Sequence, residues 1–170
     1  MNELAREAAE RLAKGLGEGA LAVFEDGRGV VVRVRPTAIP TALPLLRLDA
    51  ACPFDLLVEE TAVDYLGWAE KTGLQKPPAR FCILYNLFSI TRRARLFLET
   101  WVEEGESVPS AVRWYQSANW AERHIWDMFG VRFDGHPDLR RIYMPQDYEH
   151  FPLRKDFPRR GIDPQDYPQE

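Results

Sequence analysis

The sequence has few cysteines and no long hydrophobic run, and each absence excludes a class of protein. Only Cys52 and Cys82 occur, far apart and in apolar surroundings. Two thiols are too few for an iron–sulfur cluster or a thiolate zinc site, so we expect buried thiols in a reducing compartment. No stretch approaches the ~20 apolar residues that a membrane-spanning helix requires. The N-terminal stretch MNELAREAAERLAKGLG mixes acids with bases, which excludes a secretory signal and predicts a soluble, cytoplasmic protein.

Patterns that would indicate catalysis or nucleic-acid binding are also missing. There is no glycine-rich phosphate loop, and the formal net charge of −4 gives no reason to expect DNA or RNA as a partner. Neither cysteine has a histidine nearby in the sequence. Four serines are possible nucleophiles, and none has the sequence context of a nucleophile elbow: Ser89, Ser107, Ser110 and Ser117. We therefore predict no catalytic residue.

Histidines and aspartates near the C-terminus offer the one candidate metal site. The residue types are those of metal ligands, in His124, His136, His150, Asp127, Asp134 and Asp138. No pair of these histidines has the i, i+4 spacing of a helical metal motif, and two of the three lie in proline-bounded loop sequence. We therefore expect hydrogen-bonded structural histidines and no metal.

Hydrophobic periodicity predicts alternating helices and strands in the first part of the chain. The expected elements are a helix over 2–14, a hairpin over 20–34 that turns at Asp26-Gly27, a short helix within 39–55 interrupted by Pro44, and a strand over 56–65. Residues 80–90 are apolar on both alternating faces, which predicts a central strand that is covered on both sides. Leu84 lies in this strand, and we expect its replacement by alanine to cost about 2–5 kcal/mol.

Residues 94–102 alternate between an apolar face and a mixed face, and a short turn joins them antiparallel to 80–90. A helix follows from about Ser110, with a possible second start near Ser117 that Asn119 and Glu122 would cap. Helices on one face of a mostly antiparallel sheet make an α+β fold. We assign residues 1–133 to this domain.

The character of the chain changes after Phe133. Six of the thirteen prolines fall within 137–168, and neither helical nor strand periodicity survives there. The segment is nevertheless rich in large apolar residues, among them Tyr143, Phe151 and Phe157. We assign 134–170 to an extended, proline-rich C-terminal docking arm, which must lie on its own domain or on a partner. Deletion of 145–170 is expected to leave the domain folded, with a change of about 1 kcal/mol.

Basic residues alternate with acids in this arm. Arginines and lysine occur at 140, 141, 154, 155, 159 and 160, interleaved with acids at 138, 147, 149 and 156. Mixed charge of this kind makes either a solvated surface or specific ion pairs, and the arginines and aromatics favour an interface. From the residues alone, an assembly subunit is favoured over an enzyme.

The stretch SANWAERHIWDMFGVRFDGHPDLRRIYMPQDYEHFPLRKDFP, residues 117–158, resembles the signature of one family. This is the family of 30 kDa-type peripheral-arm subunits of respiratory complex I, NADH–quinone oxidoreductase. The segments VDYLG, CILYNLFSI and PSAVRWY are also similar to it. His124 departs from the pattern, because the family usually has a glutamate there.

The resemblance implies a subunit without its own cofactor. FMN, iron–sulfur clusters and quinone are expected in partner subunits, and the C-terminal segment is expected to drape over the large quinone-site subunit. The complex would lie at the cytoplasmic face of the cell membrane, and its electron donor would be NADH or ferredoxin. The alternative is the equivalent subunit of a membrane-bound NiFe hydrogenase or formate hydrogenlyase.

The resemblance also implies which residues form the interface and signature. These are Glu122, Arg123, Asp127, Phe129, His136, Asp138, Arg140, Arg141, Phe151, Arg154, Lys155 and Phe157. The charged members are expected to form ion pairs within the domain and across the joint with the partner. Trp120, Trp126 and Phe129 are expected to fix their helix to the sheet and the arm.

Overall fold

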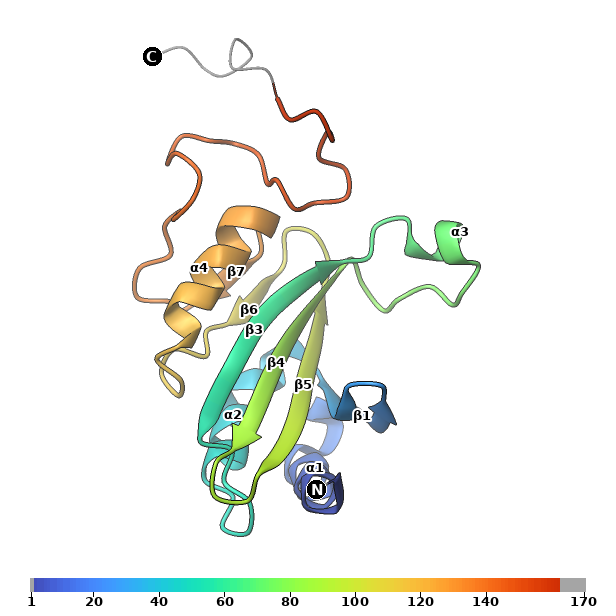
Figure 1. Ribbon diagram of the computed structural model, residues 1–170, viewed down its shortest axis with the longest axis vertical. Coiled ribbons are helices and arrows are strands. Elements are labelled where there is room, and N and C mark those ends of the chain that lie inside the picture. The colour runs from blue at the N-terminus through green and yellow to red at the C-terminus, as the bar shows by residue number, and fades with distance from the viewer. Residues whose placement is uncertain (1, 163–170) are drawn as a thin grey trace.

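A five-stranded sheet forms the centre of the computed structural model, which describes residues 2–162 (Figure 1). Its strands are β1 (Ala20–Asp26), β2 (Gly29–Val34), β3 (Leu56–Asp64), β4 (Phe81–Ser89) and β5 (Ala94–Val102). They lie in the order β1-β2-β5-β4-β3. All neighbours pair antiparallel except β2 and β5, which are parallel. The mixed α+β class and the mostly antiparallel sheet are confirmed.

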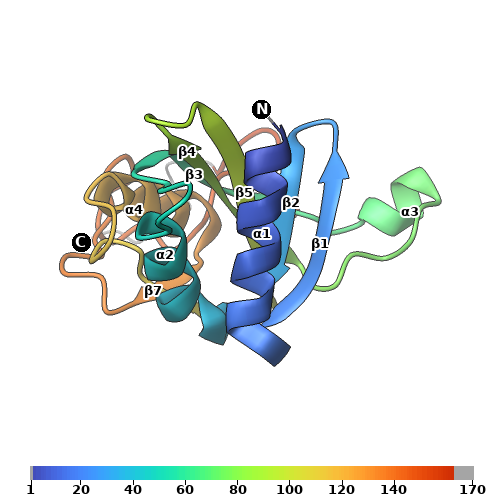
Figure 2. The same ribbon diagram turned by 90° about the horizontal axis from the view of Figure 1, so that it is seen from below.

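Three helices share one hydrophobic core with one face of this sheet. They are α1 (Asn2–Leu16), α2 (Ile39–Arg47) and α4 (Ala118–Phe129). Figure 2 shows α1 running across β2 and β5 with α2 beside it, while α4 packs against β3. Alternate strand residues, such as Ile83 and Leu98, are completely buried in this core. The predicted alternation over 94–102 places Leu98 in this core as expected.

The opposite face of the sheet has no helix over it in the described part of the chain (Figure 1). Leu84 is the cross-strand partner of Glu99 on this open face, and both Leu84 and Phe88 are only half-buried. The prediction that 80–90 is covered on both sides is therefore wrong. Apolar residues occupy this face because long side chains shield them, and Arg28, for example, lies over the Phe97 ring at 5.8 Å.

Two predicted helices differ from the observed ones. The helix expected within 39–55 ends at Arg47 and continues through Pro44, which lies inside it. The helix expected from about Ser110 begins at Ala118, and turns precede it, so the second start is the true one. Its N-cap residue, Ser117, makes no side-chain cap bond. Glu122 does not cap the helix, because its carboxylate bonds to the turn before the helix.

Several short elements were not predicted. Helix α3 (Trp68–Thr72) lies in a segment that projects beyond the sheet in Figure 1. Strands β6 (Ser107–Pro109) and β7 (Arg132–Asp134) pair parallel in a separate two-stranded sheet. Single 3-10 turns occupy Gly17–Gly19 and Pro36–Ala38. Elements of three to five residues carry too few side chains to show a period.

From residue 135 to residue 162 the chain contains neither helix nor strand, and the rest of the predicted arm, 163–170, lies outside the described residues. In Figure 1 the described segment runs above α4 and the upper ends of β3 and β5. We call residues 139–157 the strap. Leu139 and Met144 of the strap pack against the hydrophobic core. None of the helices in residues 2–162 has the length and hydrophobicity needed to cross a membrane.

Candidate functional site

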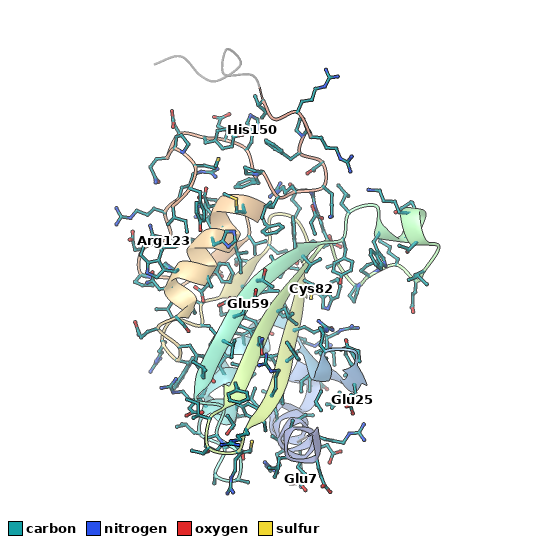
Figure 3. The ribbon with its side chains drawn as sticks, viewed as in Figure 1. Glu7, Glu25, Glu59, Cys82, Arg123 and His150 are labelled. Atoms are coloured by element: carbon teal, nitrogen blue, oxygen red, sulfur yellow. The ribbon has the colours of Figure 1, made fainter. Side chains whose placement is uncertain are left out.

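Helix α4 carries the centre of the signature and places its polar residues on different sides. Ile125 and Met128 are buried in the core. Glu122 and Asp127 are also fully buried, although both are acids. Buried carboxylates are rare unless paired or hydrogen-bonded, so each of the two requires partners. Arg123, labelled on α4 in Figure 3, lies on a third side of the helix.

Asp127 holds the first part of the strap. Its Oδ2 accepts the backbone N–H groups of Ile142, Tyr143 and Met144 at 3.0, 2.6 and 3.1 Å. Its Oδ1 accepts the Arg141 guanidinium at 2.8 Å, and that guanidinium also donates to the Asp127 carbonyl. Burial alone would raise the pKa of Asp127, but the Tyr143 N–H and the Arg141 side chain lower it below its usual value. The carboxylate is therefore the anchor of three successive backbone amides.

Arg154 holds the second part of the strap. Its Nε donates to the Phe129 carbonyl at 2.6 Å, and its guanidinium pairs with Glu104 at 2.5 Å. The same guanidinium lies 4.3 Å from the centre of the Phe151 ring. These contacts satisfy a carbonyl at the C-terminus of α4, where helices leave acceptors without partners. The strap is thus attached to both the middle and the end of α4.

Gly130, the C-cap residue of α4, makes this close approach possible. Its φ is 75°, in the left-handed region that glycine adopts without strain. A Cβ built there would meet Arg154 and Phe151 at 2.6 Å, closer than side chains approach. The glycine of the signature is therefore explained both by the backbone conformation and by the packing of the strap.

A second group of ion pairs attaches the strap to the sheet. The Arg80 guanidinium, at the start of β4, contacts Asp64 at 3.0 Å, Glu104 at 2.5 Å and Asp156 at 2.9 Å. Asp64 also accepts the backbone N–H of Lys155 at 2.9 Å. Burial alone would raise the pKa of Asp64, but the hydrogen bonds from Arg80 and from the Lys155 N–H lower it.

The remaining charged signature residues have smaller roles in this structure. Arg123 is buried, lies 4.7 Å from the centre of the Trp120 ring, and donates to the carbonyl of Arg140 at 3.2 Å. Arg140 itself pairs with Asp138 at 2.9 Å on the surface. The Lys155 side chain is exposed and makes none of the ion pairs found among the described residues.

His136 and Glu122 form a separate buried cluster. Glu122 accepts the Ser110 hydroxyl at 2.7 Å and the Ala111 N–H at 2.5 Å. The His136 side chain is fully buried, and its Nε2 lies 4.0 Å from the Glu122 carboxylate. His124 is partly exposed, with its ring centre 5.6 Å from that of Tyr143. Residues 2–162 contain no group of three or more potential ligand side chains that could hold a metal ion.

The aromatic residues divide between the strap and the surface. Trp126 contacts the Phe151 ring with centroids 5.7 Å apart, and Phe129 is buried. Phe157 is half-buried and its N–H donates to the Arg154 carbonyl at 3.2 Å. Trp120 is 64% exposed, so the expectation that it fixes the helix to the sheet is wrong. Its place on the surface leaves it free to contact another molecule.

A groove lies between β3, the first half of α4 and the strap, with a volume of about 380 Å³. We call it the α4–β3 groove. Val58, Trp120 and Tyr143 line it and are 47%, 64% and 66% exposed. Its other lining residues are Leu57, Glu59, Glu60, Ser117, Ala121, His124 and Ile142.

Comparison with known proteins identifies the family. The model of the family "Respiratory-chain NADH dehydrogenase, 30 Kd subunit" matches residues 32–163. The C-type NADH-quinone oxidoreductase subunit of Trichlorobacter lovleyi is 42% identical over 155 residues, which cover 91% of this chain and 90% of that protein. The chain belongs to this family. The protein of the same name in Acidithiobacillus ferrooxidans is 40% identical over 89% of this chain and 74% of its own length.

Two solved structures share the fold of this 30 kDa-family chain. A trypsin-resistant fragment of Nqo5 has a TM-score of 0.63 and 27% identity, and the match covers 78% of this chain and 99% of the fragment. A chain of the membrane-bound sulfane sulfur reductase, an archaeal respiratory membrane complex, has a TM-score of 0.67 and 22% identity. That match covers 90% of this chain and 85% of the other, and it shows a common fold.

Sequence reasoning missed half of the residues that hold the strap. The 30 kDa-family signature contains Asp127, Arg141 and Arg154, and the structure brings all three to α4. It contains neither Arg80 nor Asp64, which lie 76 and 92 positions before Asp156 in the sequence. No local pattern marks these two, because their common partner arrives only when the strap folds back.

Proposed function

We propose that this chain is a cofactor-free structural subunit in the peripheral arm of a proton-translocating NADH– or ferredoxin–quinone oxidoreductase. In this proposal it docks on the large quinone-site subunit, at the cytoplasmic face of the cell membrane. Family membership makes the chain a subunit of a respiratory oxidoreductase complex of the complex I type. The assembly role, the docking surface and the location are the parts that we propose.

The α4–β3 groove is the observation that carries the docking proposal. The strongest charges of the signature bind within the chain, so they are not available as the main contacts of a partner. The groove instead presents Trp120 and Tyr143, both about two-thirds exposed, beside Val58. Exposed apolar surface marks interaction sites, and tryptophan and tyrosine are the residue types that dominate binding energy. The large subunit is therefore expected to insert apolar side chains here.

The absence of a cofactor in this chain is proposed from the chemistry of its side chains. Both cysteines are buried, and burial raises the pKa of the Cys52 and Cys82 thiols, which disfavours the thiolate form that binds metals. FMN, iron–sulfur clusters and quinone then belong to partner subunits. The purified chain is expected to be colourless and unable to oxidise NADH; stoichiometric flavin or iron in folded protein would contradict this.

The docking surface is tested by Trp120→Ala in an affinity-tagged chain expressed in its own membranes. We expect the variant to lose about 2 kcal/mol of binding to the large subunit, which is roughly a thirtyfold weaker association. The measurement is the amount of large subunit that co-purifies after solubilisation. The urea midpoint of the isolated variant should stay unchanged, because Trp120 is exposed.

Trp68→Ala is the matched control, because it removes the same side chain from the projecting α3 segment. Trp68 is 40% exposed and lies outside the α4–β3 groove. Equal loss of the large subunit in both variants would contradict a specific role of the groove. The recovered partner also tests the alternative: a nickel-containing large subunit would replace complex I by a NiFe hydrogenase or formate hydrogenlyase.

A further inference from the structure

Four buried ionisable side chains meet where α4 packs on the sheet. They are Glu60 of β3, Tyr85 of β4, Glu122 of α4 and His136 from the turn after β7. Glu60 is 4% exposed, Tyr85 and Glu122 are 0% exposed, and the His136 side chain is also 0% exposed. Glu60 and Tyr85 are directly opposite each other in the β3–β4 ladder, so they share the core face of the sheet. Neither carboxylate takes part in the attachment of the strap.

The two carboxyl groups have unequal hydrogen bonding. Glu122 accepts the Ser110 hydroxyl and the Ala111 N–H, which are donors that suit an ionised carboxylate. Within residues 2–162, both oxygens of Glu60 and the hydroxyl of Tyr85 lack a partner with full hydrogen-bond geometry. An ionised carboxylate without well-placed donors is the costlier of the two in a buried site, so charge belongs on Glu122.

No cation in the described part of the chain compensates these acids. The Nδ1 atom of His136 accepts the Asp138 N–H at 2.9 Å and therefore carries no proton. Its Nε2 is 3.1 Å from the Asn119 carbonyl, which accepts the remaining ring proton, so the imidazole is neutral. Arg123 is adjacent to Glu122 in the sequence but lies over the Trp120 ring.

Electrostatics then forbids ionisation of both carboxyl groups. Burial and the nearby Glu122 charge raise the pKa of Glu60 well above its usual value, and the neighbouring Tyr85 hydroxyl offsets only part of that rise. Burial raises the pKa of Glu122 as well, and its bonds from Ser110 and Ala111 only partly offset the effect. Two like charges in one buried site cannot both persist without a cation.

We propose that Glu60 and Glu122 form an internal proton-binding site that keeps one proton on Glu60 at neutral pH, with Glu122 as the carboxylate. The ligand of this site is a proton, and its release places two negative charges between β3 and α4. Helix α4 also carries Asp127 and the Phe129 carbonyl, which hold the strap. Deprotonation therefore loosens both the helix and the strap, and the joint is sensitive to pH.

The sign of the pH dependence follows from linkage. The unfolded chain releases the Glu60 proton near the ordinary value of 4.5, whereas the folded chain keeps it to higher pH. Between these two values the folded state binds one more proton. The folding equilibrium constant therefore falls by up to about tenfold per pH unit as pH rises through this window. Below the window the contribution of Glu60 is fully present.

The test compares urea unfolding of the full chain, Glu60→Gln and Glu59→Gln between pH 5 and pH 8.5. Glutamine keeps the neutral form of Glu60 at every pH, so Glu60→Gln should lose this pH dependence and gain on the wild type by up to about tenfold per pH unit. Glu59 is exposed on the open face of the sheet, where Figure 3 labels it, and Glu59→Gln should follow the wild type. Parallel profiles of wild type and Glu60→Gln would overturn the proposal.

Infrared spectroscopy reads the proton directly and does not depend on the stability of a variant. At pH 7 the folded wild type should show the carbonyl stretch of a protonated, buried carboxylic acid, and Glu60→Gln should lack it. The absence of this band from the wild type would overturn the site. A band that survives in Glu60→Gln but vanishes in Glu122→Gln would overturn the assignment of the proton to Glu60.

Discussion

Two acids of α4, five positions apart, illustrate how surroundings decide the behaviour of a residue. Glu122 and Asp127 are both fully buried. Burial dominates at Glu122 and raises its pKa, whereas hydrogen bonds from the strap outweigh burial at Asp127 and lower its pKa. The number of donors accounts for the difference, because Asp127 receives three backbone amides and a guanidinium. The two acids therefore affect stability in opposite directions as pH changes.

Asp127→Asn is expected to destabilise the full chain by about 3–5 kcal/mol. The change leaves the buried Arg141 charge without its carboxylate, and an amide cannot accept all the bonds that Asp127 accepts. Asp138→Asn is the matched control, because its ion pair with Arg140 is exposed and is worth about 1 kcal/mol or less. Urea unfolding at pH 7 gives both values, and equal effects would show that Asp127 is not an anchor.

The same variant has a predicted pH dependence. The lowered pKa of Asp127 means that its contribution is present above the unfolded value of 3.8 and is lost as pH falls through the folded value. The wild type should therefore lose its advantage over Asp127→Asn only below about pH 4. A constant difference down to pH 2 would contradict this linkage. The window is separate from that of Glu60, which lies above pH 4.5.

At the scale of elements, β4 shows what periodicity can and cannot predict. Its bounds and its antiparallel partner followed from the sequence, because a run of apolar residues bounded by turns has few other interpretations. Its coverage did not follow, because apolar residues on both faces do not reveal whether helices or long side chains cover them. Leu84 is half-buried on the open face, whereas Ile83 is fully buried against the helices.

Ile83→Ala and Leu84→Ala remove the same number of carbons from the two faces of β4. We expect Ile83→Ala to cost about 2–5 kcal/mol, and Leu84→Ala to cost less than half as much, because solvent already reaches Leu84. This replaces the larger value that the sequence suggested for Leu84. Denaturant titration of the two variants decides the matter; a larger loss for Leu84→Ala would mean that the open face is a second core.

The start of α4 shows a different limit of sequence reasoning. Asn119 and Glu122 have the spacing of a capping box, yet Glu122 bonds to Ser110 and Ala111 in the preceding turn. The pattern located the second helix start correctly, since α4 begins at Ala118. It misassigned the role of the acid, because a tertiary contact competes with the local one.

At the scale of the whole molecule, the strap joins parts of the chain that are far apart in sequence. The signature predicted that charged residues near the C-terminus would pair, and Arg141 and Arg154 do so with residues of the domain. Their partners and the anchors Arg80 and Asp64 were beyond prediction, because ion pairing depends on the folded path of 139–157. Polar contacts of this kind carry no periodicity, whereas the sheet that they join does.

Deletion of residues 145–170 tests whether the strap is part of the folded unit. The sequence suggested a change of about 1 kcal/mol, but the truncation removes Arg154 from the Phe129 carbonyl and Asp156 from Arg80. Hydrogen bonds to charged groups contribute about 1.5–3 kcal/mol each, so we expect the truncated chain to lose more than about 2 kcal/mol. Its unfolding should remain a single transition, because the core of α1, α2, α4 and the sheet stays intact.

Two arginines of the C-terminal segment provide the matched control for this deletion. Arg154→Ala should account for a large part of the loss, because its side chain is only 14% exposed and binds Glu104 and the end of α4. Arg159 is exposed, and Arg159→Ala should change stability by less than about 0.5 kcal/mol. Urea unfolding of the three proteins beside the wild type distinguishes the possibilities. A truncated chain as stable as the wild type would mean that the strap rests on the domain without stabilising it, and its contacts would then serve mainly to position the α4–β3 groove for a partner.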